Sequence, residues 1–330
     1  LCRLDYVDNS SRRAGFRPVY LCKFLMRKFI WKLILFIAIL VAVDLALGQT
    51  IRLYDYIRGG DIGKAHQVMT MIEPDVLVLG SSRASHHYDS DTIGAILGKE
   101  VFNAGFNGQG SLMAYGLLQG VKSRKTPEVV VYELTPLFDV FEDSGSSSIN
   151  MLAPYKDSYG LDSLFYDIDS TNRYKMLAKS YAYNSALLRM LPNILLRRSQ
   201  NIDGYEPLYG ELREPAKTDI TTGSKHRVDP VKLKYFKKLI CETRNAGCRV
   251  VFTMSPTLID DDDAYYRDML DIAENMNIPV FDHSRDTAFI NHPSYFQDNT
   301  HMNYKGAEKY TKVFAEELRE YLTTKSQSEK

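Results

Sequence analysis

Five short apolar segments, each bounded by Gly, Pro or Asn, alternate with helical patterns over most of this chain. They are too short for helices and rich in Val, Ile and Phe, which is typical of buried strands. They span Asp75–Gly80, Val101–Ala104, Glu128–Leu134, Arg249–Met254 and Ile278–Asp282. Strands that alternate with helices form a parallel sheet covered by helices on both faces. The pattern therefore predicts an α/β three-layer sandwich with a parallel five-stranded sheet in the flavodoxin-like order.

The segments between the strands carry apolar residues at helical spacing. The clearest start and stop signals are Asp229, a good N-cap, and Gly247, a good stop, on either side of one pattern. Residues 50–73 are predicted to form a short helical segment before the first strand, and residues 323–330 a disordered tail. The connecting helices are expected at Thr92–Leu97, Ser111–Ser123, Pro230–Ala246, Ala264–Met276 and Tyr304–Leu322.

One connection is far longer than a crossover between parallel strands requires. Residues 140–228 are therefore predicted to be a largely helical insertion that leaves the sheet from the carboxyl end of a strand, where ligand sites form in α/β proteins. We expect a helix pair around Thr171–Leu196 and interpret the insertion as a lid or substrate platform. Its tyrosines can stack on sugar rings or simply pack the insertion: Tyr155, Tyr159, Tyr166, Tyr174, Tyr181, Tyr183, Tyr205 and Tyr209.

The N-terminal part resembles a membrane-targeting segment. Residues 1–28 are rich in Lys and Arg, and residues 29–48 contain an uninterrupted apolar core, Leu33–Val43, between Lys32 and Asp44. A spanning helix needs about 20 apolar residues and a signal-peptide core roughly 7–15. A signal anchor and a signal peptide cleaved near Ala46-Leu47-Gly48, with a start at Met26, both fit. Either places the remaining chain outside the cytoplasm, with the basic flank inside.

Composition excludes several classes of function. The 330 residues carry 41 Lys and Arg against 41 Asp and Glu, so no net charge favours nucleic acid. Four cysteines are too few for a disulfide scaffold; Cys241 and Cys248 either pair or remain separate thiols. The adjacent His86 and His87 lack the spacing of metal ligands, and the acidic run 260–263 lacks that of a calcium site. We expect no metal and no cofactor; a nucleotide or flavin module would need a glycine-rich phosphate loop.

Two short motifs carry the chemistry. The first strand stops at Gly80-Ser81-Ser82-Arg83, which presents hydroxyl groups at the sheet edge. Asp298 and His301 stand three residues apart, just before the last helix. The carboxylate can orient the imidazole, and the imidazole can take the proton of a serine supplied from elsewhere in the fold. Alone, the serine motif also fits an ordinary turn in which Ser82 or Ser85 caps the next helix.

These motifs resemble those of the SGNH/GDSL hydrolase superfamily. The resemblance covers about Asp75 to Leu322, in two parts (49–139 and 229–322) around the insertion. It consists of a serine after the first strand, a glycine after the second, Gly105, and the final D-x-x-H pair. It implies Ser82 as nucleophile, His301 as base and Asp298 as its orienting acid. It also implies an oxyanion hole that includes the backbone N–H groups of Ser82 and Gly105.

The family's third oxyanion donor, an asparagine after the third strand, has no counterpart here. That position reads Glu133-Leu134-Thr135-Pro136, where a glutamate would repel an oxyanion and a proline has no N–H. One lost donor costs on the order of 10²–10³ in rate. We expect Asn107, after the second strand, to replace the missing asparagine as the third oxyanion donor.

Two neighbouring residues are candidate substrate contacts. Arg83 can bind an anionic substrate group or pair with a local carboxylate. Asn103 can contact substrate or satisfy loop backbone.

The departure resembles a divergent, membrane-tethered branch that includes polysaccharide O-acetyltransferases and proteins of D-alanyl-lipoteichoic acid assembly. The sequence thus predicts an extracytoplasmic serine esterase or O-acyltransferase that acts on an acylated cell-envelope glycan. The expected partners are an acylated carbohydrate or cell-wall polymer and the membrane, not nucleic acid. The alternative is a non-catalytic, polysaccharide-binding or assembly protein on the same fold.

Overall fold

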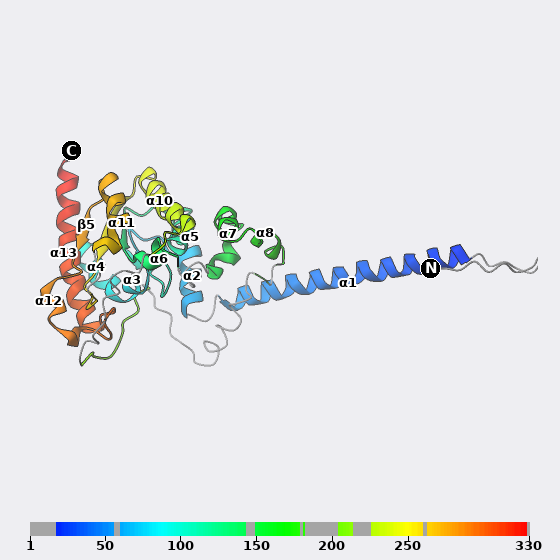
Figure 1. Cartoon of the computed structure of the whole chain (residues 1–330), viewed down its shortest axis with the longest axis horizontal. Helices are drawn as coiled ribbons and strands as arrows, with labels where there is room; N and C mark the ends of the chain where they lie inside the picture. The colour runs from blue at the N-terminus through cyan, green and yellow to red at the C-terminus, as the bar shows by residue number, and fades with distance from the viewer. Residues whose placement is uncertain are drawn as a thin grey trace, which may run out of the picture.

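The computed structural model contains one five-stranded sheet, all parallel, in the order β2-β1-β3-β4-β5. It confirms the predicted fold class (Figure 1). The structure describes residues 18–55, 60–142, 149–178, 181, 204–213, 226–259 and 263–328. The strands are β1 (Val76–Gly80), β2 (Val101–Asn103), β3 (Val129–Glu133), β4 (Arg249–Met254) and β5 (Val280–Asp282). Each lies within one or two residues of its predicted bounds, because the apolar runs are the buried parts of the strands.

The register brings the candidate residues to one edge of the sheet. Gly80, the last residue of β1, pairs with Glu133, the last residue of β3. β4 continues past Thr253, which pairs with Glu133. The segments that leave β1, β3 and β4 therefore start side by side.

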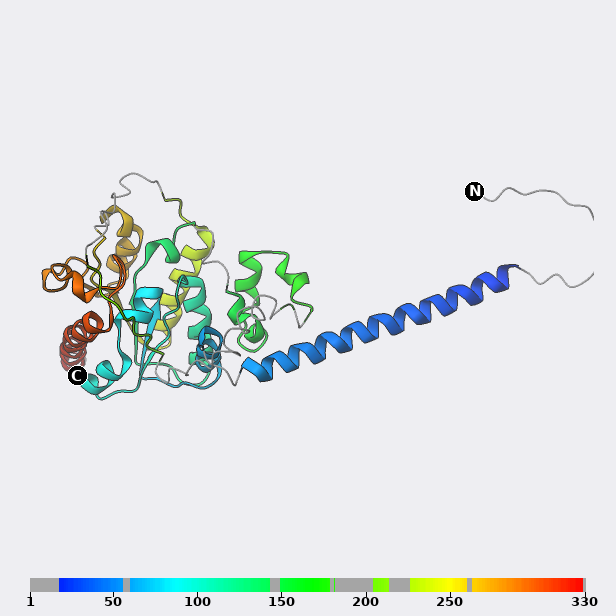
Figure 2. The same ribbon diagram turned by 90° about the horizontal axis from the view of Figure 1, so that it is seen from below.

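Two buried clusters cover the two faces of the sheet. On one face lie α2 (Gly60–Thr70), α5 (Ser111–Lys122), α10 (Pro230–Asn245) and α11 (Asp263–Asn275). The other carries α3 (Ser82–His87), α4 (Ser90–Leu97), α12 (Thr287–Ile290), the 3₁₀ turn η3 (Pro293–Tyr295) and α13 (Tyr304–Ser328). Figure 2 shows α13 on the opposite side of the sheet from α5 and α10.

Local capping explains where several helices begin and end. The Asp229 side chain accepts hydrogen bonds from the N–H groups of Val231 and Lys232, so α10 starts as predicted. Asp89 caps α4, which ends at Gly98 in the left-handed conformation, φ 66°. At the other end of the chain, α13 extends to Ser328 rather than stopping at Leu322. The segment after Leu322 contains neither Gly nor Pro, so no residue there ends the helix, and the predicted disordered tail is mostly helical.

The long connection between β3 and β4 has one part that packs against α2 and α5 and another that lies near the carboxyl edge of the sheet. Its first part forms α6 (Pro136–Asp139), η1 (Asn150–Tyr155), α7 (Asp162–Ile168) and α8 (Asn172–Lys175). This part packs beside α2 and α5: the Tyr159 hydroxyl donates to the Met69 carbonyl at 2.6 Å, and Leu152 lies against Gly116. Tyr155 is buried, so some of the tyrosines pack the insertion. Most of the predicted helix pair around Thr171–Leu196, including Tyr183, lies outside the described residues.

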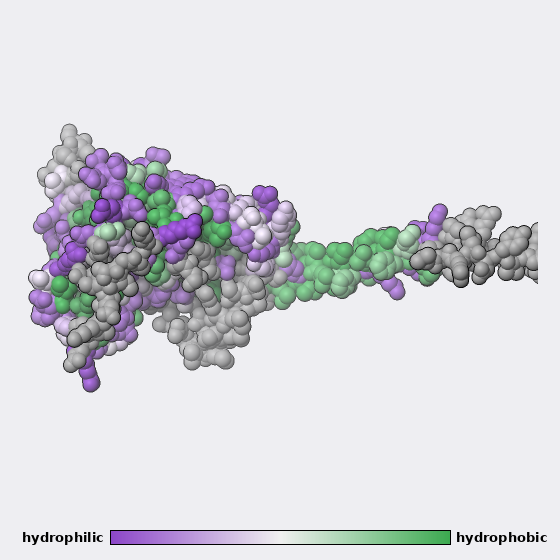
Figure 3. Space-filling model, in the orientation of Figure 1, coloured by the Kyte–Doolittle hydropathy of each residue, from purple (hydrophilic) through white to green (hydrophobic). Residues whose placement is uncertain are grey.

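A single long helix, α1 (Pro18–Asp55), precedes the sheet domain. It points away from the rest of the chain, on the side where α7 and α8 lie (Figures 1 and 2). Within Lys23–Leu47, an 18-residue window has a mean hydropathy of 2.5 and contains no buried residue. Figure 3 shows an apolar surface along the middle of this helix and hydrophilic residues toward its outer end. By length and composition it can cross a membrane, and a signal sequence has the same properties.

Gly105, after β2, sits where the chain passes closest to α3. A Cβ at this position would lie 2.5 Å from the Ser85 nitrogen and 2.7 Å from the Ala84 Cβ. Gly105→Ala should therefore lower the free energy of unfolding by about 1–3 kcal/mol, because backbone and a methyl group must move. Urea unfolding of the detergent-solubilised chain measures this change.

Gly63→Ala is the matched control, because nothing lies within 4 Å of a Cβ there and Gly63 is inside α2. It should leave stability unchanged or raise it by up to about 1 kcal/mol. Equal effects of the two substitutions would contradict the close approach at Gly105.

Candidate active site

Ser82, His301 and Asp298 form a hydrogen-bonded row at the carboxyl edge of the sheet. The His301 Nε2 lies 2.7 Å from the Ser82 Oγ. The His301 Nδ1 lies 3.0 Å from both carboxylate oxygens of Asp298. Because a carboxylate only accepts, Nδ1 carries the proton in the neutral ring, and Nε2 accepts from the Ser82 hydroxyl. The residues that the sequence singled out as nucleophile, base and acid are therefore in contact.

A sharp turn presents Ser82. Gly80 ends β1 with φ 138°, and a Cβ there would lie 2.8 Å from the Glu133 carbonyl oxygen. Only glycine fits this conformation so close to a neighbouring strand. The helix α3 begins two residues later with Ser82 in its first turn, where backbone N–H groups lack partners within the helix. The side chain of Ser82 is half-buried rather than enclosed.

A closed loop presents the other two residues. Phe296 and Met302 form an antiparallel bridge, and the Gln297 N–H donates to the His301 carbonyl at 2.9 Å. Asp298 Oδ1 also accepts from the backbone N–H groups of Thr300 and His301, each at 2.8 Å. Burial opposes ionisation of Asp298, but the hydrogen bonds from the His301 side chain and from these amides outweigh it and lower its pKa. Asp298 is thus held as an anion facing the imidazole.

Gly105 lies beside α3, and its backbone groups are already engaged. Its N–H donates to the Asn103 Oδ1 at 2.9 Å, and its carbonyl accepts from the Lys64 Nζ at 2.7 Å. Asn103 is fully buried and its Nδ2 donates to the carbonyls of Ala84 and Tyr88. The predicted substrate contact for Asn103 is therefore wrong: its side chain satisfies loop backbone. Burial lowers the pKa of Lys64. No motif in the sequence indicated that Lys64 lies at this site.

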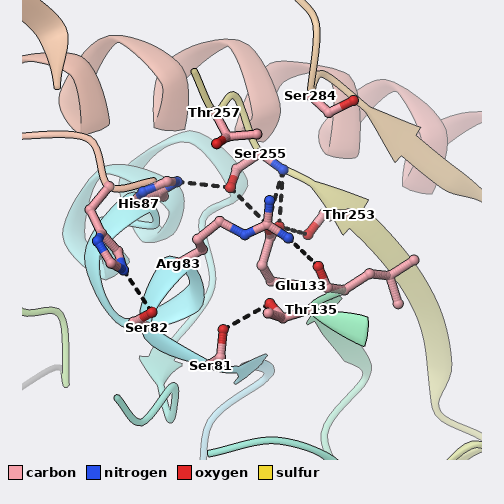
Figure 4. A network of polar contacts seen from close by, with 12 residues as sticks. Ser81, Ser82, Arg83, His87, Glu133, Thr135, Thr253, Ser255, Thr257 and Ser284 are labelled. Atoms are coloured by element: carbon pink, nitrogen blue, oxygen red, sulfur yellow. Dashed lines mark hydrogen bonds and ion pairs between the residues drawn. The ribbon is translucent and has the colours of Figure 1, made fainter. Parts of the chain in front are cut away.

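Arg83 points into the protein and not toward solvent (Figure 4). Its Nε lies 3.2 Å from the Glu133 Oε1, and both side chains are buried. Arg83 also donates to the Leu134 carbonyl and the Tyr266 hydroxyl. Burial disfavours the guanidinium charge, but Tyr266 and Glu133 outweigh it and raise the pKa of Arg83. The predicted substrate contact is wrong, and pairing with a local carboxylate is what the structure has.

Glu133 has a different role from the one inferred from its position in the sequence. Its carboxylate accepts from the hydroxyls of Tyr88, Thr253 and Ser255 and from the Ser255 N–H, in addition to facing Arg83. Figure 4 shows Arg83, Thr253 and Ser255 converging on Glu133. The negative charge is thus enclosed and paired, so the expected repulsion of an oxyanion by Glu133 is not supported.

Thr135 lies two residues after the end of β3. Its Oγ1 is 2.8 Å from the Ser81 Oγ, and it is half-buried (Figure 4). Its N–H donates to the Asp139 Oδ2 at 2.6 Å. The sequence pattern does not indicate this hydroxyl, because the donor expected after β3 is a side-chain amide.

The remaining predicted donor, Asn107, is exposed and its side chain is a hydrogen-bond partner of His86. The His86 ring meets the His301 ring edge to face, with centroids 5.6 Å apart. Burial lowers the pKa of His86, and the nearby His301 adds to this effect. Asn107 therefore lies in the neighbourhood of the row but points at His86.

Residues 204–213, in the second half of the insertion, run along the site. The Glu206 N–H donates to the Ser85 carbonyl, and the His86 Nδ1 donates to the Glu206 carbonyl. Farther along, the Tyr304 N–H donates to the Leu208 carbonyl at 2.8 Å. This part of the insertion therefore borders the site. The sequence could not separate it from the part that packs against α2 and α5.

Other predicted features fall outside the site. Among the described residues, no cluster of His, Cys, Asp or Glu is arranged to hold a metal ion. Most of the acidic run 260–263 lies outside the described residues. Cys241 and Cys248 are both free thiols, the first exposed and the second buried. Of the two alternatives left open for these cysteines, the structure has the separate thiols.

Comparison with known proteins adds little. No protein-family model matches the sequence, and no curated protein matches it. Among solved structures, the chain is similar to a "putative acylhydrolase" from Bacteroides fragilis, with 12% identity and a TM-score of 0.37. The match covers 77% of this chain and 95% of the other. Similarity at this level does not assign an activity.

The buried pair of Arg83 and Glu133 predicts a non-additive stability effect. Glu133→Gln or Arg83→Met alone should each cost about 3–5 kcal/mol, because each leaves its partner buried without an opposite charge. The double variant should cost clearly less than the sum of the two. Urea unfolding of all four proteins measures the coupling, and strictly additive losses would contradict an energetically coupled pair.

Asp139 predicts a pH-dependent stability. Burial raises its pKa to about 7 from 3.8, against hydrogen bonds from Tyr132 and Thr135 that favour the anion. Since the folded pKa is above the unfolded value, this group's stabilisation is complete below pH 4 and is lost as pH rises to about 7. Asp139→Asn should remove that loss, so its stability relative to wild type should rise by up to roughly 4 kcal/mol from pH 4 to 8. Parallel pH profiles of the two proteins would refute the assignment.

Proposed function

We propose that this chain is a serine esterase or O-acyltransferase of the SGNH type, in which Ser82, His301 and Asp298 are the catalytic residues. The observation that carries the proposal is the row of contacts: Ser82 Oγ to His301 Nε2 at 2.7 Å, and His301 Nδ1 to Asp298 at 3.0 Å. A hydroxyl, an imidazole and a carboxylate in this sequence activate a nucleophile for acyl transfer.

In the proposed reaction the Ser82 Oγ attacks an ester carbonyl while His301 Nε2 takes its proton. Asp298 keeps the imidazole in the required tautomer and stabilises its cationic form. The tetrahedral intermediate then expels the alcohol, which receives the proton from His301, and leaves an acyl group on Ser82. Water or a sugar hydroxyl, deprotonated by His301, then attacks the acyl-enzyme. The bond from the acyl group to Ser82 Oγ breaks, His301 returns the proton to this oxygen, and an acid or a new ester is released. The choice between water and a sugar hydroxyl separates an esterase from an acyltransferase.

The proposed oxyanion hole begins with the N–H of Ser82, in the first turn of α3. The N–H of Gly105 is the second proposed donor, and it must exchange its hydrogen bond with the Asn103 Oδ1 or share it. Asn107 remains the proposed third donor after a rotation away from His86. The half-buried Thr135 hydroxyl, which neighbours Ser81, is an alternative third donor.

We further propose an acylated cell-envelope glycan as substrate, outside the cytoplasm. Two observations support this. The apolar helix α1 has the properties of a membrane anchor or signal sequence. Tyr209, in the segment that borders the site, and Tyr304, three residues after His301, expose their rings with centroids 5.3 Å apart. Exposed aromatic rings of this kind can stack on sugars.

Covalent labelling tests the proposed nucleophile. A fluorophosphonate should label the full-length chain in detergent on one serine, and Ser82→Ala should abolish labelling. His301→Ala should slow it by about 10²–10⁴-fold, because the general base is lost. Gel fluorescence followed over time measures both effects.

Ser81→Ala is the matched control for Ser82→Ala. The Ser81 hydroxyl contacts Thr135 rather than His301, so this variant should keep most of the labelling rate. Unchanged labelling of Ser82→Ala, or loss of labelling only in Ser81→Ala, would contradict Ser82 as nucleophile.

A non-catalytic, polysaccharide-binding protein on the same fold is the second candidate. The engaged N–H of Gly105 and the absence of an asparagine after β3 favour it. It predicts no labelling of the wild type, and binding of acylated polysaccharide that is equal in wild type, Ser82→Ala and His301→Ala. Labelling restricted to Ser82, with turnover of acetyl esters, would exclude it.

A further inference from the structure

His87 connects the loop that carries His301 to the interior of the protein. It is the last residue of α3, the short helix that begins with Ser82, and its side chain is fully buried. Its Nε2 accepts a hydrogen bond from the Met302 N–H at 2.9 Å. Its Nδ1 lies 2.7 Å from the Ser255 Oγ (Figure 4). One helix thus holds the proposed nucleophile at one end and a contact to the proposed base's loop at the other.

The directions of these hydrogen bonds are fixed. A backbone N–H can only donate, so the His87 Nε2 has no proton and Nδ1 carries the single proton of a neutral ring. Nδ1–H therefore donates to Ser255, whose hydroxyl donates in turn to the Glu133 Oε1 at 2.7 Å. The chain runs from the Met302 amide through His87 and Ser255 to a buried carboxylate that only accepts.

The groups around His87 favour its neutral form. Burial lowers the pKa of His87 well below the usual value, and His301, Arg83 and His86 lower it further. The Glu133 carboxylate reaches it only through Ser255. A second contact fixes the helix itself, because the Thr311 hydroxyl of α13 donates to the His87 carbonyl at 2.9 Å.

The bond from Met302 orients one peptide unit. The His301 carbonyl and the Met302 N–H belong to the same planar peptide group. Gln297 N–H binds the carbonyl at 2.9 Å, and His87 binds the N–H at 2.9 Å. A plane held at both ends cannot rotate freely, and it is attached directly to the Cα of His301. The position of the imidazole relative to Ser82 therefore depends on His87.

We propose that His87 is a positioning residue that holds the His301–Met302 peptide, and with it the His301 ring, in reach of Ser82. This role rests on the proposed function for its effect on catalysis. His87 touches neither Ser82 nor a substrate in this arrangement; it acts through the Met302 amide. The buried Glu133, the last residue of β3, serves as the acceptor at the far end of this chain.

Two substitutions of His87 distinguish its hydrogen bond to the Met302 N–H from a contribution to core packing alone. His87→Leu removes both hydrogen bonds and leaves the Met302 N–H without its acceptor. His87→Gln keeps a side-chain oxygen that can accept from Met302. Leu239→Ala, in α10, is the stability control, because it opens a core cavity at a cost of about 2–5 kcal/mol at a residue outside the site.

The experiment uses the full-length chain in detergent and two measurements on each folded variant. One is the rate constant of fluorophosphonate labelling as a function of pH. The other is the side-chain spectrum of ¹⁵N-histidine-labelled protein, in which seven histidines give separate signals for tautomer and titration. His87→Leu should slow labelling by about 10–100-fold, since a misplaced base loses its geometry. It should also shift the pH profile and the titration of His301, and His87→Gln should restore part of both.

The histidine spectra test the positioning role of His87 even if the chain is not a serine esterase or acyltransferase. Wild-type His87 should show the Nδ1–H tautomer and no titration between pH 5 and 9. If the wild type is not labelled, the proposed function fails, and a changed His301 titration in His87→Leu still supports the positioning role. Leu239→Ala should keep the wild-type labelling rate constant and spectra.

An Nε2–H tautomer at His87 overturns the proposal. So does folded His87→Leu with wild-type His301 titration. A His87→Leu defect that Leu239→Ala reproduces in full also overturns it, because stability alone then explains the loss.

Discussion

The buried carboxylate of Glu133 is the charge around which this site is arranged. It terminates β3 beside the end of β1, in a position that no solvent reaches. A charge there is tolerated only with an opposite charge and several donors. Arg83 in α3 and Tyr88 directly after it supply the charge and one donor, and Thr253 in β4 and Ser255 directly after β4 supply the others. Satisfying one carboxylate therefore ties together the segments that form the carboxyl edge of the sheet.

That arrangement extends to the proposed catalytic residues. Arg83 follows Ser82 directly, so its ion pair with Glu133 fixes the first turn of α3. Through Ser255 and His87 the same carboxylate reaches the amide after His301. Ser82 and His301 are 219 residues apart in the chain but share one buried anchor. The exposed part of the row, Asp298, is held by its own loop through local backbone hydrogen bonds.

The sequence allowed the fold and the row of Ser82, His301 and Asp298 to be predicted, because both depend on local patterns. Apolar runs mark buried strands, and chain order places Ser82 and His301 at the same edge of a parallel sheet. The roles of Arg83, Asn103 and Glu133 could not be predicted, since they depend on which partners are buried beside them. For Arg83 and Asn103 the sequence left a substrate contact and a structural role both open, and at Glu133 it indicated repulsion of an oxyanion. The roles of His87 and Lys64 had no sequence signal either, because a buried histidine or lysine acquires such a role from distant backbone groups.

The central claim is that Ser82 carries an acyl group during the reaction. The most direct measurement is mass spectrometry of the acid-quenched, full-length protein during turnover of an acetyl ester. Trypsin releases residues 65–83 as one peptide that contains both Ser81 and Ser82, and fragmentation distinguishes the two. The account predicts an acetyl adduct on Ser82 that accumulates during turnover and is absent in His301→Ala. Steady ester turnover with no adduct on this peptide, or with the adduct on Ser81, would contradict it.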